Sequence, residues 1–446
     1  MAFANDDRRN VDALFVVFGK NPHTWRTKRG PLVKEMRISS ALEASLYPFV
    51  AAVYPLFRQQ MWGAVVIRIA RLAAACSLVL FFLIPGALGH APQEAPQSAA
   101  APSAVDSEYG KLEKLLSFVR ARNAEQYAIL SPKGIDEGSF VKIGSIDQWI
   151  TIRGQDRDNP VMLFLHGGPG DVTNPWSFAL FAPWEKHFIV VQWDERGAGR
   201  TLRKSGPAVA STITVDRMVQ DGIELAEYLR KHLGKEKIII LGHSFGSILG
   251  TRMARARPEL FYAYVGTGQV ADGTKNNSAT YDALLQKAKA TGDQRAMDEL
   301  SRVGPPPWNS GEGYRVQHKW ANAFENADQF LDATIGLTLV APGNSVQDLN
   351  DSADGQLLSG DRLWPQTNAI RPADLGLEFS LPFFVFQGEE DFTTSTALAR
   401  QYLESIKALH KQFVAIKGGG HFAVFMRSDQ FLEELVARVR PLAIGH

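Results

Sequence analysis

The segment GHSFG at residues 242–246 constrains the fold and chemistry of this chain more than any other stretch. It has the pattern Gly-x-Ser-x-Gly and directly follows a β-branched run at residues 237–241, which predicts a buried strand. A helix-like segment follows, from Ser247 to about Ala256. Strand, sharp turn and helix together predict a nucleophile elbow, in which the turn exposes the hydroxyl of Ser244.

An exposed serine is a poor nucleophile unless a base and an orienting acid accompany it, and after such an elbow the expected chain order is Ser, acid, His. His421 follows three glycines at the end of a short predicted strand, which places it on a loop rather than in a core. The acid is expected after the apolar run at residues 381–387, where three acidic residues are clustered. We select Asp391, because a loop acid must clear the strand end before it turns toward the histidine. Glu389 and Glu390 remain alternatives.

A third component would stabilise the developing oxyanion. The apolar run at residues 161–165 ends in the loop HGGPG at residues 166–170. Such a loop supplies one backbone N–H, and the residue after the nucleophile, Phe245, supplies the second. His166 is interpreted as a structural residue that shapes this loop.

Three segments together carry a family resemblance: HGGPG at 166–170, WDERGAGRT at 193–201 and GHSFGS at 242–247. They resemble the proline iminopeptidase group of α/β-hydrolases, which are serine aminopeptidases, and the resemblance covers roughly residues 135–440. It implies an acyl-enzyme mechanism without a cofactor. It also implies that Ser244, Asp391 and His421 form a catalytic triad and that Gly168 and Phe245 are the oxyanion-hole donors.

The chain also departs from that family's pattern. The family elbow usually reads GGSWGS, whereas this chain has His243 and Phe245 at the two variable positions. Family members bind the substrate's amino group with cap acids, one of them in a W-x-x-W-E stretch. The nearest match here runs from Trp320 to Glu325 and is one residue too long. Glu325 is therefore the candidate amine ligand, and a strict requirement for N-terminal proline stays open.

Alternating strand-like and helix-like segments predict an α/β-hydrolase fold, with a doubly wound, mostly parallel sheet. Residues 271–375 break this rhythm and predict a mainly helical cap inserted after the sixth strand, between core segments 109–270 and 376–446. Most aromatic residues of this cap are expected in its own core. Trp308 and Trp320 are our choices for those that line the substrate pocket.

The N-terminal part has a different composition. Residues 72–89 carry no charge and end in small residues, and Met61 would start a conventional signal peptide at 61–89. Residues 1–60 would then be an extension or a mis-assigned start. The alternative is a signal anchor, which would tether the protein to a membrane through residues 72–89. Residues 90–108 form an Ala/Pro-rich linker after this segment. Because the segment at 61–89 has the pattern of a signal peptide, we expect export to the periplasm or secretion.

The charge balance and the motifs that the sequence lacks exclude several classes of function. The net charge is +1, from 48 basic and 47 acidic residues, which gives no electrostatic basis for binding nucleic acid. Neither a Gly-rich phosphate loop nor a Cys/His cluster appears in the sequence, so neither a cofactor nor a metal is expected. The resemblance to the proline iminopeptidase group implies that the substrate is a short peptide with a free N-terminus. A carboxylesterase acting on a small ester and a slow-turnover receptor of the same fold are the alternatives, and the sequence leaves the oligomeric state open.

Overall fold

The computed structural model describes residues 108–308 and 311–444, all of which belong to one compact unit. The expected extension, signal segment and most of the linker, residues 1–107, lie outside the described residues. Within the described part of the chain, no helix has the length and apolar character needed to span a bilayer.

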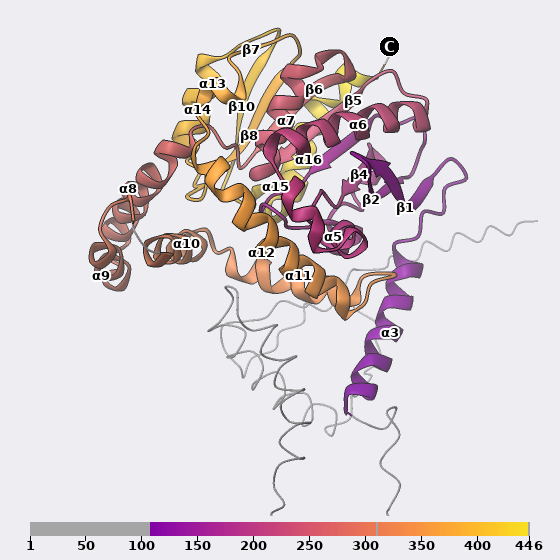
Figure 1. Ribbon diagram of the computed structural model, residues 1–446, viewed down its shortest axis with the longest axis horizontal. Coiled ribbons are helices and arrows are strands. Elements are labelled where there is room, and N and C mark those ends of the chain that lie inside the picture. Colours follow the sequence, from indigo (N-terminus) through magenta and orange to yellow (C-terminus); the bar gives the residue numbers. More distant parts are fainter. Residues whose placement is uncertain (1–107, 309–310, 445–446) are drawn as a thin grey trace, which may run out of the picture. The chain divides into compact units, whose positions relative to one another are not determined.

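An eight-stranded sheet forms the centre of the fold (Figure 1). Its strand order is β1-β2-β4-β3-β5-β6-β8-β10; β1 and β2 are antiparallel, β2 is antiparallel to β4, and the remaining neighbours are parallel. The predicted mostly parallel sheet is therefore confirmed. The strands are β1 Ile135–Ile143, β2 Ile146–Gly154, β3 Val161–Leu165, β4 Ile189–Trp193, β5 Ile238–His243, β6 Phe261–Thr267, β8 Phe383–Gly388 and β10 Lys411–Ile416. A separate small sheet pairs β7 Glu378–Phe379 with β9 Lys407–Ala408.

Helices outside the cap precede, connect and follow these strands. They are α3 Glu108–Gln126, α4 Asn174–Leu180, α5 Gly199–Ser205, α6 Val215–Leu233, α7 Phe245–Ala256, α14 Thr396–Ser405, α15 Ala423–Met426 and α16 Ser428–Arg438. Four short 3-10 turns lie at Trp184–Lys186, Pro207–Thr212, Pro258–Leu260 and Arg440–Ala443. Helix α6 is capped at both ends by its neighbouring residues. Its N-cap Thr214 accepts a hydrogen bond from the backbone N–H of Arg217, and Gly234 ends it in a left-handed conformation.

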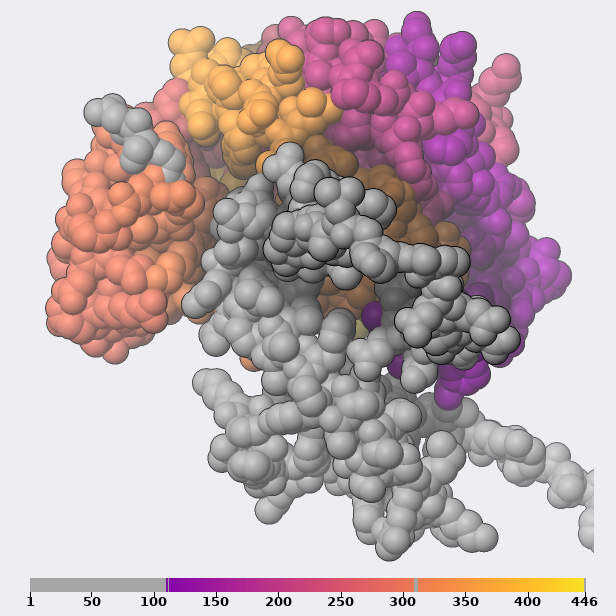
Figure 2. Space-filling view, turned by 60° about the horizontal axis from the view of Figure 1, so that its bottom comes forward, coloured from indigo at the N-terminus to yellow at the C-terminus, as the bar shows by residue number. Residues whose placement is uncertain are grey.

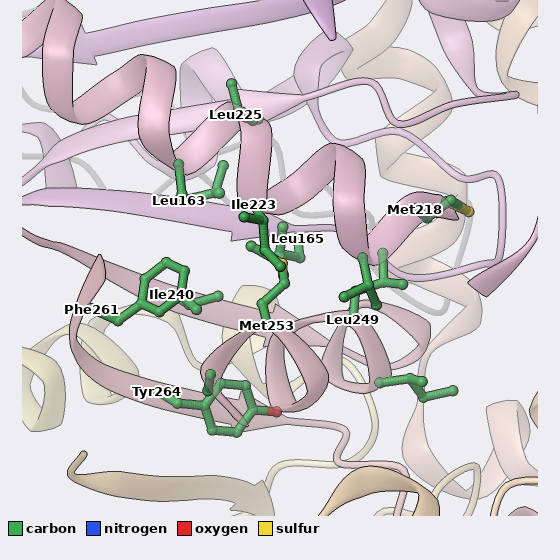
Figure 3. Packing of buried hydrophobic residues seen from close by; sticks show 14 of the residues in the cluster. Leu163, Leu165, Met218, Ile223, Leu225, Ile240, Leu249, Met253, Phe261 and Tyr264 are labelled. Carbon is green, nitrogen blue, oxygen red and sulfur yellow. The ribbon is translucent and has the colours of Figure 1, made fainter. Parts of the chain in front are cut away.

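The period of two along each strand divides the core between the two faces of the sheet. In β3, Leu163 and Leu165 pack with α6 and α7, and Figure 3 shows Leu165 beside Ile223 and Met253 of those helices. Met162 and Phe164 of β3 belong to the cluster on the opposite face of the sheet, which contains side chains of α4 and α16. Both faces of the sheet are thus covered, as a doubly wound α/β fold requires.

We call residues 271–375, between β6 and β7, the cap. Its helices are α8 Gly273–Thr291, α9 Gln294–Val303, α10 Gly311–Glu325, α11 Asp328–Val340, α12 Val346–Asn368 and α13 Pro372–Leu375. Helices α8 to α10 share a hydrophobic cluster of their own and form the salmon-coloured lobe in Figure 2. Helix α12 instead contacts the core: Asp348 accepts a hydrogen bond from Arg200 of α5 at 2.8 Å, and the hydroxyl of Ser359 donates to the carbonyl of Gly197 at 2.9 Å.

Candidate active site

Ser244 lies on a strained turn between β5 and α7. Its φ is 53° and its ψ is −120°, a backbone conformation that a residue with a side chain rarely adopts. The flanking glycines permit this turn because the backbone approaches closely on both sides. A Cβ at Gly246 would lie 2.2 Å from the carbonyl oxygen of Leu165, and one at Gly242 would lie 2.5 Å from that of Gly246. The turn leaves the Ser244 residue half-buried at the end of the sheet.

Three loops at the carboxyl ends of parallel strands bring the predicted triad residues together. Nε2 of His421, after β10, lies 3.0 Å from Oγ of Ser244. Nδ1 of His421 lies 3.1 Å from Oδ2 of Asp391, after β8, and 3.2 Å from Oδ1. Because a carboxylate only accepts, Nδ1 carries the proton, and Nε2 is left to accept the proton of the serine hydroxyl. Both His421 and Asp391 are buried.

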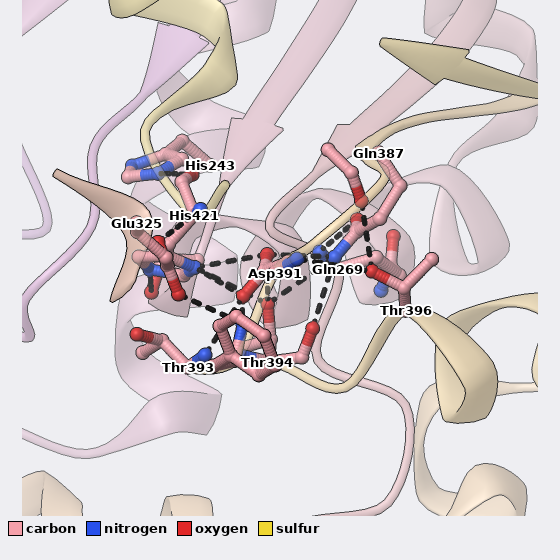
Figure 4. A network of polar contacts seen from close by, with 12 residues as sticks. His243, Gln269, Glu325, Gln387, Asp391, Thr393, Thr394, Thr396 and His421 are labelled. Atoms are coloured by element: carbon pink, nitrogen blue, oxygen red, sulfur yellow. Dashed lines mark hydrogen bonds and ion pairs between the residues drawn. The ribbon is translucent and has the colours of Figure 1, made fainter. Parts of the chain in front are cut away.

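The position of Asp391 is fixed by a dense set of donors (Figure 4). Oδ1 accepts the backbone N–H groups of Thr393 at 2.9 Å and Thr394 at 2.7 Å. Oδ2 accepts the side-chain amide of Gln387 at 2.7 Å and the hydroxyl of Thr394 at 2.8 Å. Each oxygen is therefore held by groups other than the imidazole, so the carboxylate can hold the ring in one orientation.

The two alternative acids point elsewhere. Glu390 is exposed and pairs with Lys287 of the cap, at 2.6 Å between Oε1 and Nζ. Glu389 accepts the backbone N–H of Gly418 at 3.0 Å. Asp391 is the acidic residue of this loop that hydrogen-bonds to the histidine ring.

The charge state of His421 follows from its surroundings. Burial opposes the charged imidazolium and is the largest single influence on its pKa. The attraction of Asp391, the hydrogen bond with the same carboxylate and the charge of Glu325 oppose burial and together raise the pKa above its ordinary value of 6.5. This arrangement stabilises the imidazolium that forms when the histidine takes a proton.

The HGGPG loop runs directly beside the nucleophile. A Cβ at Gly167 would lie 3.1 Å from Cβ of Ser244, so this loop passes close to the serine. The backbone N–H of Phe245 belongs to the first turn of α7, where N–H groups have no partner within the helix. His166 donates from Nδ1 to the carbonyl of Gly167 at 2.9 Å and accepts at Nε2 from the N–H of Glu195. Burial lowers the pKa of His166 to about 4, so it is a neutral residue that shapes the loop.

The segment at residues 193–201 has an architectural role. Arg196 forms a buried ion pair with Asp221 of α6, at 2.7 Å between Nε and Oδ2, and donates to the carbonyl of Gly144 at 2.9 Å. Asp194 accepts the backbone N–H of Arg200 at 2.9 Å. These contacts join the β4–α5 loop to the β1–β2 turn and to α6, away from the reacting groups.

Comparison with known proteins identifies the family of this chain. The profile of the alpha/beta hydrolase fold family matches residues 160–427, which is more than half of the chain. The chain belongs to the α/β-hydrolase family.

It is 25% identical over 286 residues to "Probable aminopeptidase YbaC" of Bacillus subtilis, covering 63% of this chain and 89% of that protein. It is 35% identical over 149 residues to a "Probable proline iminopeptidase" of Streptomyces coelicolor, covering 33% of this chain and 43% of that protein. The crystal structure of a proline iminopeptidase-related protein from Thermus thermophilus superposes with a TM-score of 0.49 and 19% identity, covering 69% of this chain and 99% of that one.

One residue of this α/β-hydrolase site was not assigned a role from the sequence. His243 precedes the nucleophile, is buried, and donates from Nε2 to the carbonyl of His421 at 3.1 Å. Burial, with the neighbouring His421 as the next cause, lowers the pKa of His243 well below its usual range, so the ring is neutral. The sequence showed only that a histidine stands where the resembling family has glycine. Its partner lies 178 residues further along the chain.

The structure places the aromatic cap candidates inside the cap. Trp320 is buried in the α8–α10 cluster, and its indole N–H donates to Glu299 at 3.1 Å. Trp308 packs edge-on against Tyr314, with 5.0 Å between ring centroids, and donates to the carbonyl of Gly304 at 2.9 Å. Their polar groups are thus used within the cap. A pocket-lining role for Trp308 or Trp320 stays a prediction.

Glu325 lies beside the triad, at the end of α10. Oε1 accepts the backbone N–H of Phe392 at 2.7 Å, and Oε2 accepts that of His421 at 2.5 Å. Burial, and after it the negative charge of Asp391, raise the pKa of Glu325, while the charge of His421 and the two backbone N–H donors act in the opposite direction and favour the ionised carboxylate. In the described part of the chain, no group of three or more His, Cys, Asp or Glu side chains is arranged to hold a metal ion.

Proposed function

We propose that this α/β-hydrolase is a serine hydrolase that acts through an acyl-enzyme. The observation that carries the proposal is the continuous hydrogen-bonded series from Oγ of Ser244 through His421 to Asp391, with the serine on a strained, half-buried turn. These are the groups that nucleophilic acyl transfer needs, in the order in which it uses them.

In the proposed reaction His421 accepts the hydroxyl proton at Nε2 while Oγ of Ser244 attacks a carbonyl carbon. The carbonyl oxygen becomes an oxyanion beside the backbone N–H groups of Gly168 and Phe245. Collapse of this intermediate expels the leaving amine or alcohol, which takes the proton from His421, and leaves an ester on Ser244. Water, deprotonated by His421, then attacks the ester carbonyl; as the acyl–oxygen bond breaks, His421 returns the proton to Oγ of Ser244 and the acid is released. Asp391 keeps Nδ1 protonated throughout.

We further propose an aminopeptidase that releases N-terminal residues from short peptides, with specificity of the proline iminopeptidase type. The support for this substrate class is the similarity to proteins named as a probable aminopeptidase and a probable proline iminopeptidase.

A carboxylesterase is the second candidate, and the surroundings of three cap acids that could meet a substrate amine, Glu325, Glu312 and Asp361, favour it. The carboxylate of Glu325 already accepts two backbone N–H groups. Glu312 is exposed and pairs with Arg302, and Asp361 is exposed on α12. A substrate ammonium group needs an available buried carboxylate, whereas a neutral ester does not.

Two measurements on the full-length protein test these proposals. A fluorophosphonate probe should label the wild-type protein stoichiometrically and leave Ser244→Ala unlabelled; an unlabelled wild-type protein would contradict the serine hydrolase proposal. A panel of aminoacyl-naphthylamides and p-nitrophenyl esters then separates the candidates. Higher kcat/KM for a prolyl-naphthylamide than for its N-acetylated form supports the aminopeptidase, because acetylation removes the ammonium group. Turnover of esters alone supports the carboxylesterase.

A further inference from the structure

Glu325 joins the two loops that carry the triad's acid and base. One carboxylate oxygen accepts the N–H of Phe392, the residue directly after Asp391, at 2.7 Å. The other oxygen accepts the N–H of His421 itself at 2.5 Å. Glu325 is the last residue of α10 and is buried, so a single cap side chain bridges backbone positions on both loops.

The base loop is shaped around this carboxylate. A Cβ at Gly420 would lie 2.5 Å from Oε2 of Glu325, 2.7 Å from its Cγ and 2.8 Å from its Cδ. The glycine before His421 is therefore needed because the side chain of Glu325 occupies the space that a Cβ would fill. This close fit supports a structural partnership between the cap and the base loop.

The acid loop has further bonds to the cap. The side chain of Asn276 on α8 donates to the carbonyl of Thr393 at 2.8 Å and accepts the N–H of Ser395 at 2.9 Å. The ring of Phe392 belongs to the cap's hydrophobic cluster and lies 6.3 Å from that of Phe324. The cap thus holds the acid loop through α8 and α10, and Glu325 extends this connection to the base.

We propose that Glu325 is a positioning residue through which the cap sets the distance between Asp391 and His421. The proposal rests on the serine hydrolase function proposed above and assigns to Glu325 a role other than amine binding. Turning the carboxylate toward a substrate ammonium group would leave two backbone N–H groups without their acceptors at the acid and base loops. Such a loss would disturb the geometry that catalysis requires.

The test is Glu325→Gln in the full-length protein. A glutamine has one acceptor oxygen, and its NH₂ group would face the second backbone N–H, so one of the two bonds is lost. We expect kcat to fall about tenfold or more, equally for an aminoacyl-naphthylamide and a neutral p-nitrophenyl ester, with KM changed less than about threefold. The low-field proton NMR signal of Nδ1–H between His421 and Asp391 should shift or broaden.

Glu299→Gln is the matched control. Its carboxylate bonds to Arg295, Lys319 and Trp320, all within the cap, and contacts neither triad loop. The control should leave kcat and the Nδ1–H signal as in the wild type. Equal changes in both variants would show that any cap perturbation has this effect and would overturn the specific role of Glu325.

Other outcomes also decide the proposal. A rise in KM confined to the amine substrate, with kcat and the NMR signal unchanged, would make Glu325 the ammonium ligand and overturn a positioning role. If Glu325→Gln does not fold, Glu325→Asp is measured instead: its shorter stem draws both acceptor oxygens away from the two N–H groups, so kcat should fall and the Nδ1–H signal should shift relative to the wild type, and wild-type values of both would overturn the proposal. The NMR measurement needs no turnover, so an unchanged signal overturns the proposal even if the protein proves not to be a hydrolase.

Discussion

Nε2 of His243 donates a hydrogen bond to the backbone carbonyl of His421, with 3.1 Å between the two atoms. His243, which directly precedes the nucleophile Ser244, therefore fixes the backbone of His421, the base that faces Ser244. The two imidazole rings lie 5.0 Å apart, and the ring of Phe425 packs edge-on against His243 at 5.2 Å. This bond fixes the base loop from the side of the elbow, whereas Glu325 fixes it from the side of the cap.

His243→Ala should weaken both folding and catalysis. The substitution removes a buried ring and leaves the carbonyl of His421 without this donor, which together cost about 2–4 kcal/mol of unfolding free energy. We expect kcat to fall more than KM rises, because the base loses its support while the substrate pocket remains. Urea denaturation and steady-state kinetics measure the two effects, and wild-type kcat in a folded variant would contradict the second.

Asp391→Asn should reduce kcat by about four powers of ten, as in other triads, because the amide no longer fixes the tautomer of His421. Glu390→Gln is the control and should retain kcat, since its carboxylate pairs with Lys287 at the surface. The comparison is made at saturating substrate. High activity in Asp391→Asn with loss in Glu390→Gln would transfer the role of acid to Glu390.

The pH profile of kcat/KM should rise through the pKa of His421, because only the neutral imidazole can accept the serine proton. That pKa is raised, so the acid limb should lie above pH 6.5. The ionisable groups that face the ring are Asp391 and Glu325, whose charges raise its pKa, and the neutral His243 and His318, which lie nearby. In Asp391→Asn the acid limb should move to lower pH. Burial lowers the pKa of His421, and without the charge of Asp391 less opposes this effect. A limb that stays in place would show that another group controls it.

Gly420→Ala should lower activity because the new Cβ would meet the Glu325 carboxylate at 2.5 Å and force one of the two to move. We expect kcat to fall at least as much as in Glu325→Gln. Gly336→Ala on α11 is the control: nothing lies within 4 Å of its Cβ position, and alanine stabilises a helix by up to about 1 kcal/mol relative to glycine. Thermal unfolding and ester hydrolysis report both results. Full activity in Gly420→Ala would mean that the loop adapts freely.

We propose that the protein is exported through the segment at residues 61–89, which lies outside the described residues. Cleavage after the small-residue end should give a mature chain that begins near His90. N-terminal sequencing of protein from the extracytoplasmic fraction tests this. A mature chain that retains residues 62–89 would favour the membrane anchor.

Local signals in the sequence determined the elbow and the strand ends. The β-branched run before Gly242, the glycines around Ser244 and the three glycines before His421 each act within a few residues, so pattern alone predicts the turn and the loop. The bounds of α6 are equally local, because Thr214 and Gly234 cap it. Asp391 was the preferred acid because a loop acid must lie beyond the strand end to reach the histidine. In the structure its carboxylate lies 3.1 Å from Nδ1 of His421.

Only the tertiary structure decided which side chains meet across the chain. His243 and Glu325 contact the same residue, His421, from positions 178 and 96 residues away, and no periodicity in the sequence records such a pairing. Trp320 shows the same limit, since an aromatic residue at helical spacing fits a cap core and a pocket wall equally well. Packing of α10 against α8 and α9 turned it inward. Local backbone conformation is determined by residues that are adjacent in the sequence. The distances between groups in the site depend instead on how loops from separate strands pack together.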